Sequence, residues 1–594
     1  MADQQGSLAA HGVPEHGGEV MSAAPAVGSA QRTVRRLITY LLLFALVVIA
    51  AIGLSGLLER LLVAGTPLAT ADVAGLARSL AFALIGGPLA AVLWWVVWRR
   101  LGDEAERASV GWGLYLAGAY VLSLILATSN LLSTLSTLIG GRSLQWRASL
   151  ATGLVWAAVW VWHRWMWRHP RKRPLDLSDV PTVLGSYIGL VMGVSGAIGA
   201  LSVLLDAALR GALAAGMVGK PWWVSALQSL VWAAGGGLVW WWHWKHDGGR
   251  LLRTDLASVG LIAVGVLGAG VLTLGGAGVT VFVLLRLAFD RTEPMEQLLE
   301  PLATAVAATA IGSLVWVYHR GLARGSSETI RQGSRLVTSG VALVAAASGI
   351  GVIVNATLAM AATPFAGSGT RTLLLGGISS LLVGGPVWWL SWQPLQRTPE
   401  PKTGAAGDSG RWQNSRRVYL IVVFGLSAVV AVITLLVIGY RMFEFFLGDL
   451  SGGSVVERIR APLGLLVATA LVAGYHFAVW RHERSVSAAA APPRKRTIGH
   501  VVLVTGTDPA PLHRVIEDVT GAGVTVWRRA DAGAGSGTGP GPGAAAGPGT
   551  GTGPAADAGQ LAGRLAGELE GVTGARVLVT VSPDGRIEVI PLQG

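Results

Sequence analysis

Four histidines lie near the ends of tryptophan-rich apolar segments: His163, His243, His319 and His476. A neutral imidazole binds transition metals and haem, so these side chains could hold a cofactor. The spacing argues against this, because no two of them lie one helical turn apart. We expect no cofactor and no metal, and interpret these histidines and the tryptophans before them as anchors at the membrane interface, followed by cations that reach the headgroups. The tryptophans are Trp94, Trp160, Trp240, Trp316 and Trp388.

A second set of polar residues occupies similar places, late in alternate apolar segments. Polar groups at membrane depth are costly and often functional, so a ring of them would suit a charged substrate or an ion path. The alternative is that they mark helix ends at the interface, or form charge pairs that fix the packing. This candidate polar ring is Glu59, Asn130, Asp206, Arg286, Asn355 and Arg441.

The sequence carries no further catalytic pattern. There is no Ser-His-Asp order, no pair of carboxylates on one helix face and no HExxH motif, and the chain has no cysteine. The glycine-rich stretch 533–553 lacks the lysine and the strand-turn-helix context of a phosphate-binding loop. We therefore expect the protein not to be an enzyme.

The segments that carry these residues are too apolar for a soluble protein. Of 594 residues, 52% are hydrophobic and only 13% are charged, about half the usual charged fraction of roughly 25%. Twelve segments have the ~20 apolar residues that a bilayer requires. They are residues 37–58, 76–98, 110–138, 148–167, 181–209, 222–244, 256–288, 297–319, 334–361, 372–392, 416–440 and 459–480.

The placement of the cations predicts the orientation. Alternate loops, beginning with the N-terminal side, hold most of the lysines and arginines, so both termini are expected in the cytoplasm and the protein in the cell membrane. Topology thus accounts for the net charge of +13, and we expect no nucleic-acid partner. The basic loops could alternatively bind anionic lipid or a ligand.

The apolar segments repeat. When the five tryptophans are aligned, the residues three positions later are Val97, His163, His243, His319 and Ser391, and a sixth copy has Ala473 and His476. This predicts an all-α polytopic protein whose twelve helices form six tandem, parallel hairpins. The segments GGPVWWLSW (384–392) and LVWVYHR (314–320) resemble the bacterial membrane family named domain of unknown function 5671, over about residues 35–485. The resemblance implies the hairpin repeat and no activity.

The chain ends differ in character from these repeats. Residues 1–34 are predicted to be disordered, and residues 486–499 form a basic Pro/Ala linker. A small cytoplasmic α/β domain is predicted over 500–594, interrupted by a Gly/Pro-rich insertion at 531–557. Its expected elements are strands 501–505, 524–528, 576–581 and 586–590 and helices 509–520 and 558–570.

Three functions remain open from the sequence. The first is a non-enzymatic scaffold or sensor that uses residues 500–594 to bind a cytoplasmic partner and the hairpins to hold the bilayer. The second is a transporter or channel that uses the polar ring. The third is a redox or metal protein that uses the histidines.

Overall fold

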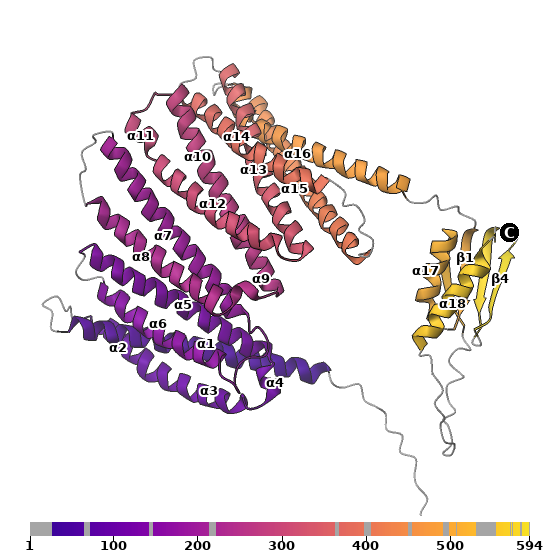
Figure 1. Cartoon of the computed structure of the whole chain (residues 1–594), viewed down its shortest axis with the longest axis horizontal. Coiled ribbons are helices and arrows are strands. Elements are labelled where there is room, and N and C mark those ends of the chain that lie inside the picture. The colour runs from indigo at the N-terminus through magenta and orange to yellow at the C-terminus, as the bar shows by residue number, and fades with distance from the viewer. Residues whose placement is uncertain are drawn as a thin grey trace, which may run out of the picture. The chain divides into compact units, whose positions relative to one another are not determined.

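The computed structural model describes residues 26–64, 72–141, 146–212, 221–362, 368–396, 406–448, 454–490, 498–506, 508–529, 554–570, 572, 574–582 and 585–592. It divides into two compact units, residues 1–477 and 478–594. The first unit is a bundle of long helices, and the second contains a small sheet (Figure 1).

All twelve predicted membrane segments are helical. π-Helical turns, which accommodate an extra residue in a helix, occur at Phe82–Gly86 between α2 and α3, at Trp242–His246 after α8, and at Leu261–Gly268 between α9 and α10. The helices of the first unit are α1 (Ala26–Val63), α2 (Val73–Ala81), α3 (Gly87–Arg100), α4 (Glu104–Arg107), α5 (Val110–Ile139), α6 (Trp146–Trp167), α7 (Val180–Ala212), α8 (Trp222–Trp241), α9 (Asp255–Gly260), α10 (Ala269–Phe289), α11 (Met295–Leu299), α12 (Leu302–Arg324), α13 (Glu328–Ala362), α14 (Ser368–Gln396), α15 (Ala406–Leu447) and α16 (Val455–Ala490).

Two of these helices extend into regions predicted to lack structure. Helix α1 begins at Ala26, so residues 26–34 are helical rather than disordered. Helix α16 continues to Ala490, into the predicted linker. Alanine, glutamine and arginine are good helix formers, and here they prolong a helix that has already started.

Neighbouring helices pack through glycine. Helices α5 and α6, α7 and α8, α10 and α12, and α13 and α14 are the most extensively paired. A Cβ atom at Gly193 of α7 would lie 2.9 Å from the backbone nitrogen of Gly237 in α8, and one at Gly377 of α14 would lie 2.9 Å from that of Ile353 in α13. Small residues let helix backbones approach closely in membranes. This explains the glycine run that precedes Trp240 in α8.

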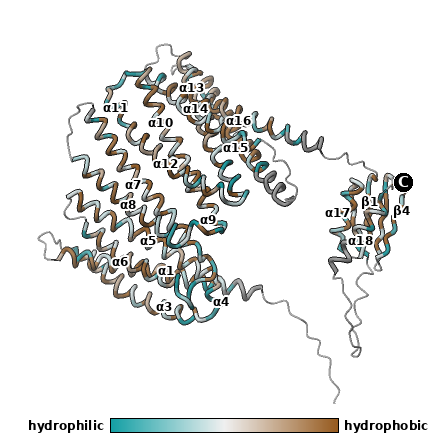
Figure 2. Tube along the Cα trace, in the orientation of Figure 1, coloured by the Kyte–Doolittle hydropathy of each residue, from teal (hydrophilic) through white to brown (hydrophobic). Residues whose placement is uncertain are grey.

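The outer surface of the bundle is apolar. Figure 2 shows hydrophobic residues along most of each long helix and hydrophilic ones toward the ends. Leu314, Leu390 and Leu436 are 68–69% exposed, as lipid-facing side chains would be. Within the described residues, ten helices are long and apolar enough to cross a bilayer; the tryptophan-rich helices α6 and α8 are not among them. The chain is therefore a multi-pass membrane protein, with ten candidate spans rather than the predicted twelve.

The C-terminal unit is a two-layer α/β fold. Its strands are β1 (Ile498–Thr505), β2 (Gly523–Arg528), β3 (Gly574–Val581) and β4 (Ile587–Leu592), in the sheet order β2-β1-β3-β4. Strand β1 is parallel to β2 and β3, and β4 is antiparallel to β3. Helices α17 (Pro509–Thr520) and α18 (Pro554–Leu569) cover one face of the sheet (Figure 1).

Successive side chains along each strand point to opposite faces of this sheet, so the two faces carry different residues. Leu503 and Val579 are fully buried in one core with Ile516 of α17. The other face carries Val504 and, beside it, Trp527, which is 61% exposed. The predicted strands and helices are confirmed in order and type, and most of the predicted insertion lies outside the described residues.

Candidate functional site

The four repeated histidines lie inside the helix bundle, with residual exposures of 0–2%. In each, Nδ1 lies 2.7–2.8 Å from the backbone carbonyl oxygen four residues earlier. A carbonyl oxygen only accepts hydrogen bonds, so Nδ1 carries the proton and Nε2 of the neutral ring keeps a free lone pair. The structure thus places these side chains against protein, whereas the sequence analysis expects them at the lipid interface. They are His163, His243, His319 and His476.

Two of the histidines accept a hydrogen bond from a tyrosine. The hydroxyl of Tyr115 in α5 lies 3.0 Å from Nε2 of His163, and that of Tyr120 lies 2.8 Å from Nε2 of His243. Arg164 Nη1 in turn donates to the Tyr120 oxygen over 3.2 Å. The donors in this series of hydrogen bonds follow one order: Arg164 donates to the Tyr120 oxygen, and the Tyr120 hydroxyl donates to Nε2 of His243.

The other two histidines have no such partner. Nε2 of His319 and Nε2 of His476 are buried and accept no hydrogen bond from any residue that the structure describes. Their rings are instead enclosed by aromatic residues of the preceding hairpin, with centroids 5.9 Å from Trp244 and 5.6 Å from Trp392 respectively. In the described part of the chain, no group of three or more His, Asp or Glu side chains could hold a metal ion.

Glycine on the facing helix makes room for two of the rings. A Cβ atom at Gly185 of α7 would overlap the His243 ring, and one at Gly265 would lie 2.6 Å from Cδ2 of His319. Next to the His319 ring, Trp244 Nε1 donates a hydrogen bond to the Tyr318 hydroxyl over 2.8 Å. Trp244 and Tyr318 therefore bond to each other within the protein.

A buried carboxylate joins α6 to the turn after α8. The Asp247 side chain is fully buried, accepts from Arg164 at 2.9 and 3.0 Å, and also pairs with Arg168 and with His246 at 3.1 Å. Burial alone would raise the pKa of the Asp247 carboxyl, but the hydrogen bonds from Arg164 and His246 and the nearby arginine charges hold that pKa below its ordinary value. Asp247 is thus ionised at neutral pH and neutralises two arginines.

The five aligned tryptophans are half-buried. Four of them have a buried indole nitrogen without a hydrogen-bond acceptor in the described structure. The guanidinium groups of Arg164 and Arg320 lie 5.6 and 5.0 Å from the ring centres of Trp160 and Trp316, in cation–π contact. Membrane anchoring by Trp94, Trp160, Trp240, Trp316 and Trp388 stays a prediction.

The six residues of the candidate polar ring are not brought together. Among the described residues, no hydrogen bond or ion pair joins two of them; instead, five have separate partners and Glu59 is exposed. Asn130 donates to Leu126 O, Asp206 pairs with Arg210, Arg286 with Asp290 and Glu293, Asn355 accepts from Arg460, and Arg441 pairs with Glu444. The pairs favour the packing interpretation over a shared ion path.

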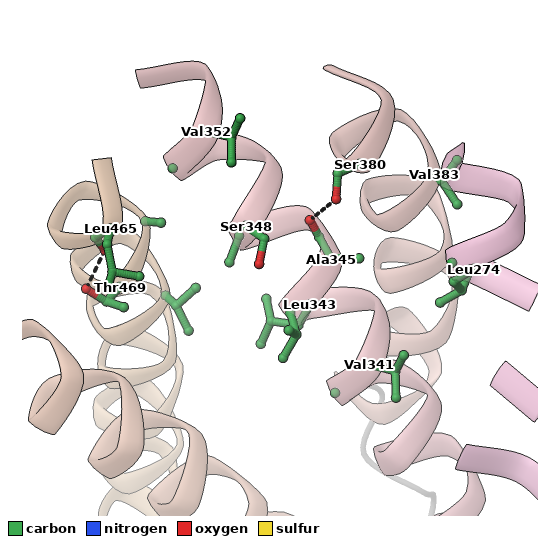
Figure 3. Close-up of a pocket in the computed structure, with 18 of the residues that line it drawn as sticks. Leu274, Val341, Leu343, Ala345, Ser348, Val352, Ser380, Val383, Leu465 and Thr469 are labelled. Carbon is green, nitrogen blue, oxygen red and sulfur yellow. Dashed lines mark hydrogen bonds between the residues drawn. The ribbon is translucent and has the colours of Figure 1, made fainter. Parts of the chain in front are cut away.

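An apolar cavity of about 1210 Å³ lies among α10, α13, α14, α15 and α16. Figure 3 shows Leu465 and Thr469 of α16 across an open space from Leu343 and Ser348 of α13. The hydroxyl of Thr469 donates to Leu465 O over 2.8 Å, and that of Ser380 donates to Ala345 O over the same distance. Because these hydroxyls are already used and no charged side chain lines the cavity, it suits an apolar occupant.

The model of one protein family, domain of unknown function DUF5671, matches three consecutive segments: residues 36–143, 179–300 and 334–472. Together these cover more than half of the chain. The chain belongs to the DUF5671 family. The comparisons with curated proteins and with solved structures found no match.

The three matches reveal a longer repeat than the single hairpin. Each DUF5671 match begins at the first helix of one hairpin and runs into the next hairpin, so we define three repeats as α1–α6, α7–α12 and α13–α16. In the first hairpin of each repeat the aligned position holds Val97, His243 or Ser391. In the second hairpin it is always histidine. The histidine therefore follows the DUF5671 period, although it is missing from two of six hairpins.

Sequence reasoning missed Tyr115, Tyr120 and Asp247. The tyrosines lie on α5, 48 and 123 residues from the histidines they contact. Asp247 carried a signal: it is the only acid in the short basic stretch between Trp240 and Arg253. An acid among cations at a helix end is a candidate ion-pair partner, but its partners on α6 could not be found without the fold.

Proposed function

We propose that this DUF5671 protein is a non-enzymatic membrane scaffold or sensor, with an apolar ligand cavity in its third repeat and a C-terminal domain that binds a cytoplasmic protein. One observation carries the proposal: five of the six polar side chains singled out at the helix ends are bonded within the protein, while the large cavity is apolar. Such an arrangement supports packing and the binding of an apolar ligand.

The cavity proposal is tested by filling it. Ser348→Phe places a ring in the space between α13 and α16 and should displace an apolar photoaffinity probe, such as a diazirine-bearing fatty alcohol, from the purified protein. Leu314→Phe, at an exposed position on α12, is the matched control and should label normally. Equal labelling of both variants at α13 and α16 would contradict an apolar site there.

The topology belongs to the same proposal. We infer twelve spans in six hairpins, with α6 and α8 crossing the bilayer and both termini in the cytoplasm of a cell whose plasma membrane holds the protein. The pairing of α6 with α5 and of α8 with α7 supports this inference. Because the chain has no cysteine, single cysteines before and after α6 can be labelled with an impermeant maleimide. Labelling of both from the same side would contradict the twelve-span topology.

The partner proposal rests on the uncovered sheet face of the C-terminal domain. Val504, Trp527 and Ile590 place apolar surface there, and Trp527 and Ile590 are 61% and 38% exposed. A photocrosslinking residue at position 527 should capture a cytoplasmic protein in intact cells, whereas one at Arg514 of α17 should not. Identical adducts at both positions would argue against this face.

A transporter remains the second candidate. The observation that favours it is the cavity volume together with Asn355, which lines the cavity and accepts from Arg460 over 3.1 Å. Flux of small apolar solutes into reconstituted vesicles would support transport if Asn355→Leu reduces it. Flux that depends on neither Asn355 nor Asp206 and Glu59 would remove this candidate.

A further inference from the structure

The second and third repeats meet at arginines that lack the acid found at the corresponding point between the first and second repeats. Arg164 and Arg168 follow Trp160 by four and eight residues, and Arg320 and Arg324 follow Trp316 by the same intervals. Asp247, the partner of the first pair, follows Trp240 by seven residues. The residue seven positions after Trp388 is Leu395, which is buried.

The packing of the helices supports this correspondence. Helix α8 of the second repeat packs on α5 of the first, and α14 of the third repeat packs on α10 of the second. The ends of α6 and α8 meet at Asp247, so the ends of α12 and α14 are the equivalent pair. By this correspondence, the apolar Leu395 holds the sequence position that Asp247 has in the first junction.

The arginines at this second position are crowded and uncompensated. The charge of Arg320 is within electrostatic range of Arg324 and Arg335, and that of Arg335 is within range of Arg331 and Arg324. Arg331 pairs with Glu328. Arg320, Arg324 and Arg335 form no ion pair in the described structure. Arg320 and Arg335 are also half-buried, so water screens their repulsion incompletely.

The location restricts what anion could enter. Arg320 lies over the ring of Trp316 in the last turns of a candidate span, where tryptophans and cations of membrane proteins typically meet the headgroups. Guanidinium groups bind phosphate oxygens in a planar, bidentate geometry. We propose that Arg320, Arg324 and Arg335 bind the phosphate of an anionic phospholipid, which takes the place that the Asp247 carboxylate has in the first junction.

The first test measures lipid binding to the purified, delipidated full chain by native mass spectrometry. Phosphatidylglycerol should bind more tightly than phosphatidylcholine with the same acyl chains. Each cation near an anionic lipid surface contributes about fivefold, so Arg320→Gln/Arg335→Gln should weaken phosphatidylglycerol binding about 25-fold. Arg171→Gln/Arg173→Gln removes the same charge from exposed residues of the loop after α6 and should leave this binding within about twofold. Equal losses in the two double variants would overturn the site.

A second arm identifies the source of the phosphate. Inorganic phosphate at millimolar concentration should not displace phosphatidylglycerol, because the acyl chains hold the headgroup at the interface. Displacement would assign the site to a soluble phosphate and overturn the lipid proposal.

A further pair of variants exchanges the residue at the equivalent position of the two junctions. Because one variant should gain a lipid site and the other should lose one, a folding defect in a single variant cannot produce both results. Asp247→Leu should create a second phosphatidylglycerol site, seen as added thermal stability with that lipid and not with phosphatidylcholine. Leu395→Asp should abolish binding at the original site. If Asp247→Leu responds equally to both lipids and Leu395→Asp binds as the natural protein does, the equivalence of the junctions is wrong.

Discussion

The two junctions between the DUF5671 repeats use the same arginine pattern in different ways. In the first, Asp247 is buried between Arg164 and Arg168, and Tyr120 connects this ion pair to His243. In the second, Leu395 holds the sequence position of the acid, and among the described residues Arg320 forms no ion pair, lies over Trp316 and is close to the charges of Arg324 and Arg335. A repeated sequence pattern therefore predicts the position of a charge, and the neighbouring repeat decides what neutralises that charge.

Removal of the Asp247 carboxylate from the first junction should lower the stability of the protein more than any other change considered below. Asp247→Asn leaves Arg164, whose side chain is only 13% exposed, without its counter-charge, and breaking a buried pair in this way typically costs about 3–5 kcal/mol. Thermal unfolding in detergent with phosphatidylcholine only should show a marked loss of stability. An unchanged midpoint would mean that the first junction, like the second, does not depend on an internal acid.

The same carboxylate predicts how stability depends on pH. Because the folded pKa of Asp247 is held below its unfolded value of about 3.9, its contribution is complete above that unfolded value. The contribution is lost as the pH falls through the folded pKa. Unfolding midpoints measured between pH 7 and pH 2.5 should therefore converge for the natural protein and Asp247→Asn. Parallel curves would contradict the assignment.

Filling the space that Gly185 leaves for the His243 ring should have a smaller effect on stability. Gly185→Ala introduces a Cβ that overlaps this ring, and overpacking of this kind costs about 1–3 kcal/mol. Gly237→Ala, on the facing helix, has no atom within 4 Å of the added Cβ and is the matched control. Chemical unfolding should separate the two, and equal behaviour would show that the ring can move away.

The tyrosine link is expected to contribute less than the packing. Tyr120→Phe removes the hydroxyl between Arg164 and His243 and leaves Nε2 without a donor, a loss of about 1 kcal/mol. Tyr115→Phe makes the same change at His163 and should cost a similar amount. A cost confined to Tyr120 would show that the arginine, rather than the histidine, needs the hydroxyl.

The smallest effect is expected where a similar ion pair is exposed. Asp206 and Arg210 are 2.8 Å apart, but their side chains are 42% and 52% exposed. Such pairs contribute about 0–1 kcal/mol. Asp206→Asn should therefore shift the unfolding midpoint far less than Asp247→Asn, and an equal shift would show that burial does not set the difference between these sites.

The sequence predicted local structure well where one periodicity or turn signal decides it. Every predicted helix and strand exists, and the helix predicted at 509–520 begins after a capping residue: Asp508 accepts from the backbone nitrogen of Ala510 over 3.1 Å. The aligned tryptophans also led to the family resemblance, which the DUF5671 matches confirm. These features depend on residues close together in the chain.

Features that depend on distant residues were missed or misplaced. His243 was expected near headgroups because Trp and Lys surround it in the sequence, yet Gly185 and Tyr120, on two other helices, enclose it. The polar ring was predicted from similar positions on alternate helices, but its members bond elsewhere: Arg286 pairs with Glu293 of the following loop, and Asp206 pairs with Arg210 of its own helix. Equal depth along a bundle does not bring side chains together.

The cavity beside α13 also affects how the bundle opens. Helices α7 and α8 touch along their backbones, whereas the interior side of α15 and α16 borders open space. Segments with fewer buried contacts open at lower free energy, so amide hydrogens are expected to exchange with solvent deuterium earlier in α15 and α16 than in α7 and α8. An occupant of the cavity would slow that exchange. Ligand binding could then be measured as longer-lived backbone hydrogen bonds in α15 and α16.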